Sequence, residues 1–443
     1  MLRNGEHLIF AHNLNENGID VPGMIFINKR GIFKTGRTWS EVINKDRSNP
    51  SSLTWISSYG SVTFNVFGRD FPDGGMNEAG LYIWEMSERA DYPRDESFPK
   101  LMHMNWMQFV LDSYSTVDAV IESAQRVEID GWNWHFFVAD ARGACASIEF
   151  FDGRAVIHQG EAMPVPALFN EPYEREMEVL GFFEGFGGSY PVDLGSMHTP
   201  RVAKTAAMLR DYPPGIDPVE YGLHMLDTLK VAEVPKWSVV FDVVGQAVHF
   251  KTRLHPSVKK VSLDGIDFSN ATPVQILNID IAEGGEVDAM LHPYDDDEVM
   301  DFLMALPLPD GFFSQGGLTR RTFCERATTY WHEAEDPGRQ HFRGRWVQAK
   351  EVRPGQEAGD VWTVELLSDG NRVTGTISRP SRDVVAAPLD HLRLEANDLS
   401  FTFRRSPGGK IYEFRATLDG DRMEARLLGT EDDYGSMSLE RAP

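Results

Sequence analysis

The chain has 443 residues, and 67 acidic against 43 basic residues give it a formal net charge of −24 at pH 7. Hydrophobic residues make up 42% and charged residues 25%, which is the balance of a soluble globular protein of two or three domains. That balance excludes a disordered or fibrous chain. A polyanion is repelled by nucleic acid and by anionic membrane surfaces, so neither is an expected partner. The two cysteines, Cys145 and Cys324, exclude a disulfide framework and a cysteine-rich zinc site.

In chain order, the first 250 residues alternate short apolar strand patterns with Gly, Asn and Asp turns and with helical blocks. Strands are expected at 8–11, 24–27, 61–67, 81–84, 135–140, 145–151, 155–158, 237–242 and 247–251. Helices are expected at 102–126, 171–183, 199–210 and 217–229. Strands and helices in separate blocks predict an α+β fold in which helices cover antiparallel sheets.

The composition changes near residue 307, where Pro307 to Gly311 and Gly316-Gly317 separate helical patterns at 296–306 and 318–334. Beyond residue 337 the pattern is one of short alternating strands, with turns at 368–371, 407–410 and 419–421. This pattern is typical of a small antiparallel β-barrel or meander. We therefore expect three parts: a main domain over 1–306, a helical linker over 307–336, and a β-rich, lipocalin-like accessory domain over 337–443.

Several isolated features have a structural interpretation that is simpler than a functional one. The glycines at 185–188 follow no strand and indicate a loop instead of a dinucleotide site. The acidic run from Asp295 to Glu298 indicates a solvated helix start, because carboxylates favour the positive end of the helix dipole. Cys145, His135 and His249 lie in apolar strand patterns, which favours a buried inert thiol and structural histidines. No metal site and no cofactor are expected.

Four segments carry a more specific signal when they are taken in order. They are 10–16 (Phe-Ala-His-Asn-Leu-Asn-Glu), 73–81 (Asp-Gly-Gly-Met-Asn-Glu-Ala-Gly-Leu, after Ser58 to Val62), 135–149, and 168–172 (Leu-Phe-Asn-Glu-Pro) followed by 199–204. Their order and spacing resemble those of the choloylglycine hydrolase family, which includes bile-salt hydrolases, penicillin V acylases and acid ceramidase-like amidases. The resemblance covers about residues 5–255, extends toward residue 300, and leaves out the β-rich tail.

The resemblance implies an αββα sandwich, the fold of N-terminal-nucleophile hydrolases, and an enzyme that hydrolyses linear amide C–N bonds of small molecules. In that family an N-terminal cysteine, freed by processing, attacks the amide carbonyl, and its own α-amine acts as the base. An α-amine has an ordinary pKa near 7.7–8.0, which suits proton transfer at neutral pH. No cofactor is implied, and a homo-oligomer is possible.

The resemblance also implies roles for particular residues. Asn170 matches the oxyanion-hole asparagine, Arg201 the active-site arginine, and Ser87 a hydrogen-bond donor at the end of the Gly-Leu strand. A purely structural role remains open for both Asn170 and Arg201. Asn170 also fits a turn before Pro172, and Arg201 also fits an exposed position at the start of a helix. Two positions depart from the family, because its arginine is His12 here and its nucleophile-positioning aspartate is Asn15, which carries no charge.

The largest departure is at the nucleophile. The family's Cys-Thr-x-Phe phrase would precede the strand at 8–11, and the sequence has Met1-Leu2-Arg3-Asn4-Gly5 there. A thioether has no proton to lose, so the chain as written lacks its nucleophile, and we expect that it starts downstream of a lost cysteine. Alternatives are a non-catalytic relative, a small-ligand-binding protein that uses the β-rich tail, and an acyltransferase with the same nucleophile. We expect a soluble protein, cytoplasmic as written and exported if an upstream signal peptide was lost.

Overall fold

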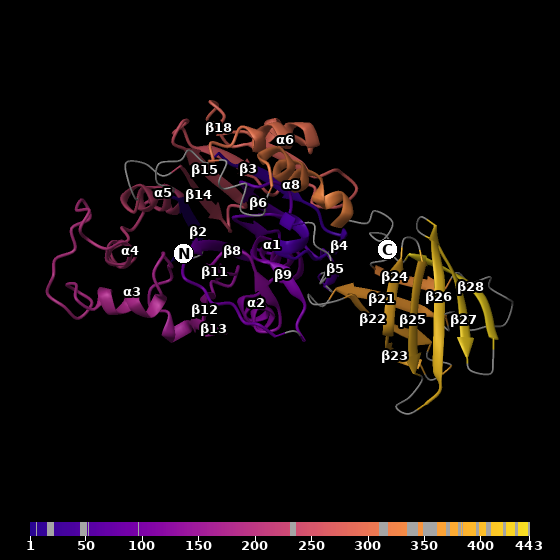
Figure 1. Ribbon diagram of the computed structural model, residues 1–443. Helices are drawn as coiled ribbons and strands as arrows, with labels where there is room; N and C mark the ends of the chain where they lie inside the picture. The colour runs from indigo at the N-terminus through magenta and orange to yellow at the C-terminus, as the bar shows by residue number, and fades with distance from the viewer. Residues whose placement is uncertain are drawn as a thin grey trace. The chain divides into compact units, whose positions relative to one another are not determined.

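Figure 1 shows the computed structural model of the chain, which folds into two compact units. Unit 1 holds 1–29, 36–52 and 59–331, and unit 2 holds 30–35, 53–58 and 332–443. The structure describes residues 1–5, 7–15, 22–44, 51, 53–95, 97–230, 236–309, 318–334, 344–348, 361–368, 373–379, 382, 384–395, 398–404, 409–419, 422–429 and 433–441. The predicted turns at 368–371, 407–410 and 419–421, together with Gly311 and the glycines at 316–317, lie wholly or partly outside these residues. The domain boundaries expected at 306/307 and 336/337 stay predictions.

Unit 1 is built on two sheets. The six-stranded sheet has the order β1 (Leu2–Asn4), β2 (His7–Leu14), β14 (Trp237–Asp242), β15 (Ala247–Thr252), β16 (Lys259–Ser262), β18 (Gly285–Glu286). The nine-stranded sheet has the order β13 (Arg154–Gln159), β12 (Cys145–Phe151), β11 (Trp134–Ala139), β8 (Tyr82–Ser87), β7 (Gly74–Asn77), β6 (Ser61–Asn65), β3 (Met24–Asn28), β17 (Gln275–Asn278), β19 (His292–Pro293). Neighbouring strands in both sheets are antiparallel, except that β18 runs parallel to β16.

Aromatic side chains from the two sheets pack against one another and form the core between them. Phe64 of β6 lies 5.5 Å from Trp237, 6.0 Å from Phe241 and 5.8 Å from Phe250, measured between ring centroids. All four rings are fully or almost fully buried. Since offset and edge-to-face aromatic pairs add to the free energy gained by burial, this cluster fixes the two sheets face to face.

Helices cover the outer faces of both sheets. α5 (Pro218–Thr228) packs on β2 and β14, and α4 (Arg201–Arg210) packs on α5 and on α3 (Tyr173–Leu180). On the other side, α1 (His103–Ser113) packs on β7 and β8, and α2 (Val117–Ala124) packs on β11 and β12. Thr116 caps α2, because its side chain accepts a hydrogen bond from Ala119 N. The layers are therefore helix, sheet, sheet and helix, as the sequence predicted.

The remaining elements of unit 1 are shorter. They are the π-helix η1 (Ser40–Asn44), the parallel pair β9 (Lys100–Met102) and β10 (Glu128–Asp130), the 3₁₀-helices η2 (Gly160–Ala162) and η3 (Asp288–Met290), α6 (Asp296–Met304) and α8 (Arg320–Ala334). Asp295 caps α6 by accepting a hydrogen bond from Glu298 N at 2.9 Å, which confirms that the acidic run starts a helix. The glycines at 185–188 lie in turns, as predicted. Among the described residues, every helix is too short or too polar to cross a bilayer.

Unit 2 contains a second nine-stranded sheet and the two-stranded sheet of β4 (Phe33–Thr35) and β5 (Thr54–Ile56). The large sheet has the order β23 (Val384–Pro388), β22 (Val373–Arg379), β21 (Thr363–Ser368), β20 (Gly344–Gln348), β28 (Asp433–Arg441), β27 (Arg422–Gly429), β26 (Ile411–Asp419), β25 (Asp398–Arg404), β24 (Asp390–Glu395). Its strands are antiparallel, and β23 approaches β25, so the sheet curls into a nearly closed barrel. Trp346, Phe401, Phe414 and Leu427 belong to the buried core on one of its faces. The small antiparallel barrel expected after residue 337 is confirmed.

Candidate active site

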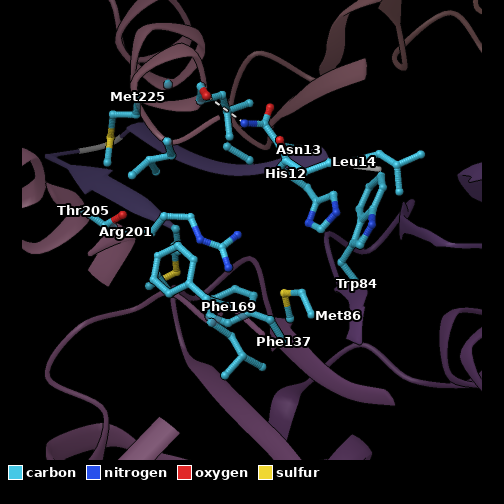
Figure 2. Close-up of a pocket in the computed structure, with 18 of the residues that line it drawn as sticks. His12, Asn13, Leu14, Trp84, Met86, Phe137, Phe169, Arg201, Thr205 and Met225 are labelled. Atoms are coloured by element: carbon cyan, nitrogen blue, oxygen red, sulfur yellow. Dashed lines mark hydrogen bonds between the residues drawn. The ribbon is translucent and has the colours of Figure 1, made fainter. Parts of the chain in front are cut away.

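A pocket of about 190 Å³ lies in unit 1 beside the first two strands (Figure 2). Its walls come from β1, β2, β8, α4, α5 and the segment 167–170. All five residues predicted from the sequence line it, namely His12, Asn15, Ser87, Asn170 and Arg201. The fold therefore brings together residues that lie far apart in the chain.

Asn170 and Arg201 are joined directly. Arg201 Nη2 donates a hydrogen bond to Asn170 Oδ1 at 2.9 Å, and Asn170 Nδ2 donates to the backbone oxygen of Ser87 at 3.1 Å. Ser87 therefore contributes its carbonyl to this contact, whereas the sequence predicted a side-chain donor. In the described part of the chain, N–H groups of Asn170 and Arg201 beyond those used in these two bonds can serve as donors to a bound molecule.

His12 lies flat on Trp84, with ring centroids 4.4 Å apart and an angle of 20° between the ring planes. Burial lowers the pKa of His12 to about 3, and the positive charge of Arg201 acts in the same direction. His12 is thus a neutral imidazole at physiological pH. His12 is therefore an uncharged group, and Arg201 supplies positive charge near this part of the pocket.

The charge of Arg201 is balanced by acidic groups and by an aromatic ring. Its guanidinium carbon lies 5.1 Å from the ring centroid of Phe169, which is a cation–π distance. Burial lowers the pKa of Arg201, while Glu176 and Glu171 act to raise it. Burial in turn raises the pKa of Glu176 to about 7, although Arg201 acts to lower it. A carboxyl group that titrates near neutral pH therefore adjoins the polar end of the pocket.

Asn13 connects β2 to its surroundings. Asn13 Nδ2 donates to Leu226 O at 2.7 Å, and Asn13 Oδ1 accepts from Ser238 Oγ at 2.7 Å. Asn13 is therefore tied to α5 and β14 and has a structural role at the pocket wall. Asn15 lies at the pocket just after β2 ends at Leu14.

The far end of the pocket is apolar, and sequence reasoning missed it. Its aliphatic lining residues are Leu2, Ile9, Leu209, Met225, Leu226 and Leu229. On α4 the pocket face runs from Arg201 to Thr205 to Leu209, a spacing of four residues that places all three on one side of the helix. This spacing is visible in the sequence. The side chains on this face of the helix change from charged to polar to apolar along the pocket.

Neither described cysteine lies in the pocket lining. Burial raises the pKa of Cys145, which agrees with the interpretation of an inert thiol. Met1 lies just before β1 and lines the pocket, and its α-nitrogen donates a hydrogen bond to Pro166 O at 2.8 Å. Among the described residues, no group of three or more His, Cys, Asp or Glu is arranged to hold a metal ion.

Comparison with known proteins agrees with this geometry. No family model matches the chain. A penicillin V acylase from Pectobacterium atrosepticum is 24% identical over 267 residues, which is 49% of this chain and 70% of that protein. The chain is therefore similar in sequence to a penicillin V acylase. The resemblance expected from the sequence motifs is thereby confirmed.

Solved structures support the same fold. The structure of penicillin V acylase from Agrobacterium tumefaciens matches with a TM-score of 0.58 and 21% identity, covering 66% of this chain and 96% of that one. A variant of conjugated bile acid hydrolase from Clostridium perfringens matches with a TM-score of 0.50 and 15% identity, covering 65% and 97%. Unit 1 therefore has the fold of the N-terminal-nucleophile hydrolases, as predicted.

Proposed function

We propose that the protein hydrolyses linear amides that carry an apolar acyl group. The observation that supports this most directly is the pair of Asn170 and Arg201, hydrogen-bonded to each other at the polar end of a pocket with an aliphatic far end. An amide carbonyl bound near Asn170 directs its acyl chain toward Leu209 and Leu226. The aliphatic lining of the pocket thus fits the acyl group of an N-acyl compound.

In the proposed reaction a thiolate adds to the amide carbonyl carbon, and the carbonyl oxygen takes up the negative charge. The Asn170 amide donates to that oxygen without changing its own protonation state, and Arg201 adds positive charge beside it. The C–N bond then breaks and the leaving amine takes a proton. Water hydrolyses the resulting thioester, which releases the carboxylic acid and restores the thiol.

We propose that the nucleophile is a cysteine encoded upstream of Met1. The register of β1 and β2 sets Leu2 opposite Ile9 and Arg3 opposite Leu8. Carried back two residues before Met1, the same register brings the chain opposite His12, which lines the pocket. A strand continuous with β1 would therefore place a residue beside His12 at the pocket.

The test compares two versions of the protein, one that starts at Met1 and one that includes the upstream codons read in frame. Release of amine is measured with a panel of N-acyl amides, with penicillin V first because the curated relative is named for it. We expect hydrolysis by the extended protein only, and its loss when the upstream cysteine is changed to alanine. An upstream sequence without cysteine, combined with no hydrolysis of any amide, would contradict the proposal.

Two related features stay proposals. Acyl transfer uses the same thioester, and it is distinguished from hydrolysis by adding an acceptor amine and measuring the new amide. A homo-oligomer is proposed from the resemblance, and the sedimentation coefficient of the full chain tests it.

A further inference from the structure

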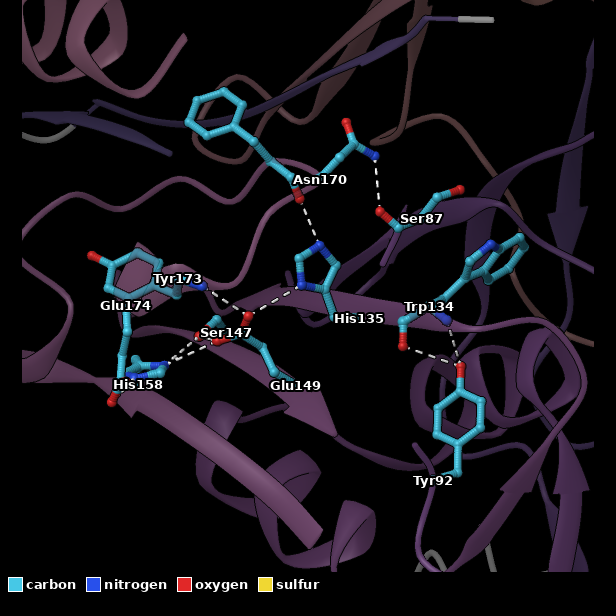
Figure 3. A network of polar contacts seen from close by, with 11 residues as sticks. Ser87, Tyr92, Trp134, His135, Ser147, Glu149, His158, Asn170, Tyr173 and Glu174 are labelled. Atoms are coloured by element: carbon cyan, nitrogen blue, oxygen red, sulfur yellow. Dashed lines mark hydrogen bonds and ion pairs between the residues drawn. The ribbon is translucent and has the colours of Figure 1, made fainter. Parts of the chain in front are cut away.

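A buried polar network lies behind the pocket wall (Figure 3). His135 of β11 and Glu149 of β12 are both fully buried, and His135 Nδ1 lies 3.3 Å from Glu149 Oε1. The cross-strand neighbour of His135 on β8 is Met86, which lines the pocket. The network therefore occupies the same face of the nine-stranded sheet as the pocket.

The two residues hold the chain on either side of Asn170. His135 Nε2 lies 2.5 Å from the backbone oxygen of Phe169, and Glu149 Oε1 accepts from Tyr173 N at 2.9 Å. Tyr173 is the first residue of α3, so the carboxylate also sits at the positive end of that helix. Asn170 lies between these two anchored points, and its own amide donates to Ser87 O.

The chemistry of the contacts fixes their direction. A carbonyl oxygen only accepts, so His135 Nε2 must carry the hydrogen that reaches Phe169 O. Nδ1 then faces a carboxylate oxygen, and a proton has to lie between these two atoms, because two lone pairs at this distance repel each other. Glu149 and His135 therefore form one hydrogen-bonded unit in a dry environment.

The second oxygen of Glu149 is also satisfied. Glu149 Oε2 lies 3.1 Å from His158 Nδ1, and Ser147 Oγ lies 3.4 Å from the same carboxylate oxygen. His158 Nε2 continues to the exposed Glu174 at 3.7 Å. Because a buried carboxylate is costly unless its lone pairs are used, these outer contacts make Glu149 available as a rigid anchor.

We propose that His135 and Glu149 are positioning residues that hold the Phe169–Tyr173 segment so that the Asn170 amide points into the pocket beside Arg201. Neither residue touches the bound amide; both act through the backbone that carries Asn170. The kinetic part of this proposal rests on the proposed function, whereas the geometric part does not.

The test uses three variants of the full chain. In His135→Gln the amide nitrogen can occupy the place of Nε2 and still donate to Phe169 O. In His135→Asn the shorter side chain reaches only the place of Nδ1 and leaves Phe169 O without its donor. His224→Gln is the matched control, because His224 is exposed on α5 and does not line the pocket.

Backbone amide hydrogen exchange of the 168–176 segment and the kinetics of amide hydrolysis are measured together. For His135→Asn we expect exchange in this segment to be about tenfold faster and kcat to fall by about 10- to 100-fold with KM nearly unchanged, since small misplacements cost this much. His135→Gln should recover most of both losses, and His224→Gln should resemble the unmodified protein. If His135 served only stability, both His135 variants would lower the melting temperature equally. The two variants would then not differ in kcat or in exchange of the segment.

The outcomes separate the two proposals. Exchange in His135→Asn equal to that of the unmodified protein overturns the positioning role, whatever the activity is. Faster exchange with unchanged kcat in an active enzyme also overturns it. If the unmodified extended protein hydrolyses no amide, the proposed function fails, while faster exchange in His135→Asn that His135→Gln restores still supports the geometric part.

Discussion

The two nine-stranded sheets of this protein differ in how their strands are buried. In unit 1, β3, β6 and β11 are buried at every position, because a second sheet covers one face and helices cover the other. In unit 2, β25 and β27 alternate between buried and more exposed residues along the strand. Along the strands of the first sheet, the sequence is a continuous apolar run with occasional polar residues. Along the strands of the second sheet, apolar and polar residues alternate.

This difference shows why the candidate site belongs to the doubly covered sheet. A polar side chain on the open face of the second sheet meets water and needs no partner. A polar side chain on the covered sheet must find one inside the protein, as His135 and Glu149 do with each other. Buried polar groups that satisfy one another are held in one geometry, which is what a reaction site requires.

The largest expected effect tests whether the two cores are independent. Phe64 and Phe414 are both fully buried, Phe64 between the sheets of unit 1 and Phe414 stacked on Phe401 at 4.6 Å in unit 2. Phe64→Ala and Phe414→Ala should each lower the free energy of unfolding by about 3–5 kcal/mol, because a large cavity replaces the ring. Urea unfolding measures the change in free energy, and calorimetry measures it independently. A single substitution that destabilises both units to the same extent would show that the two cores are not independent.

The next effect separates the site from the rest of unit 1. Asn170→Ala should lower kcat by about 10²–10³-fold, as expected for loss of one oxyanion donor. The exposed Asn133 is the matched control, and Asn133→Ala should leave kcat unchanged. Rates are compared in the extended protein with an amide that it hydrolyses. Equal activity of the Asn170→Ala and Asn133→Ala proteins would remove Asn170 from the reaction.

Acid should destabilise unit 1 through its buried histidines. Burial lowers the pKa of His12 and of His103 to about 3, against an ordinary value of 6.5. Between these values the unfolded chain binds protons that the folded chain does not, so the free energy of unfolding falls as the pH drops from about 6.5 to about 3. Urea midpoints across this range measure the slope. His103→Gln should reduce the slope of the free energy of unfolding against pH. An unchanged slope would contradict the lowered pKa of His103.

The smallest expected effect concerns Thr205 at the pocket wall. Its hydroxyl is buried and has no hydrogen-bond partner among the residues that the structure describes. Thr205→Val keeps the shape and removes the hydroxyl, so the free energy of unfolding should rise by about 1 kcal/mol. Thermal unfolding of the two proteins measures this difference. A loss of stability instead would show that the hydroxyl is satisfied in solution.

Much of the fold was predictable from local pattern. The strand at 145–151 matches β12, and the expected helix at 217–229 contains α5. Strands such as β17 and β28 were missed, because Gln275–Asn278 is short and Asp433–Arg441 contains glycine and serines that weaken the alternation. The five predicted site residues came from family resemblance, and their shared pocket came from the fold.

The sequence by itself determined the α+β class, the change to β-rich structure near residue 337, and the candidates Asn170 and Arg201. Only the tertiary structure decided that β2 lies beside β14, that Trp84 supports His12, and that His135 and Glu149 hold the chain around Asn170. The physical reason is that periodicity along a strand fixes which face is buried but not which distant strand becomes its neighbour. Contacts between distant strands depend on how whole layers pack, and that packing builds the pocket.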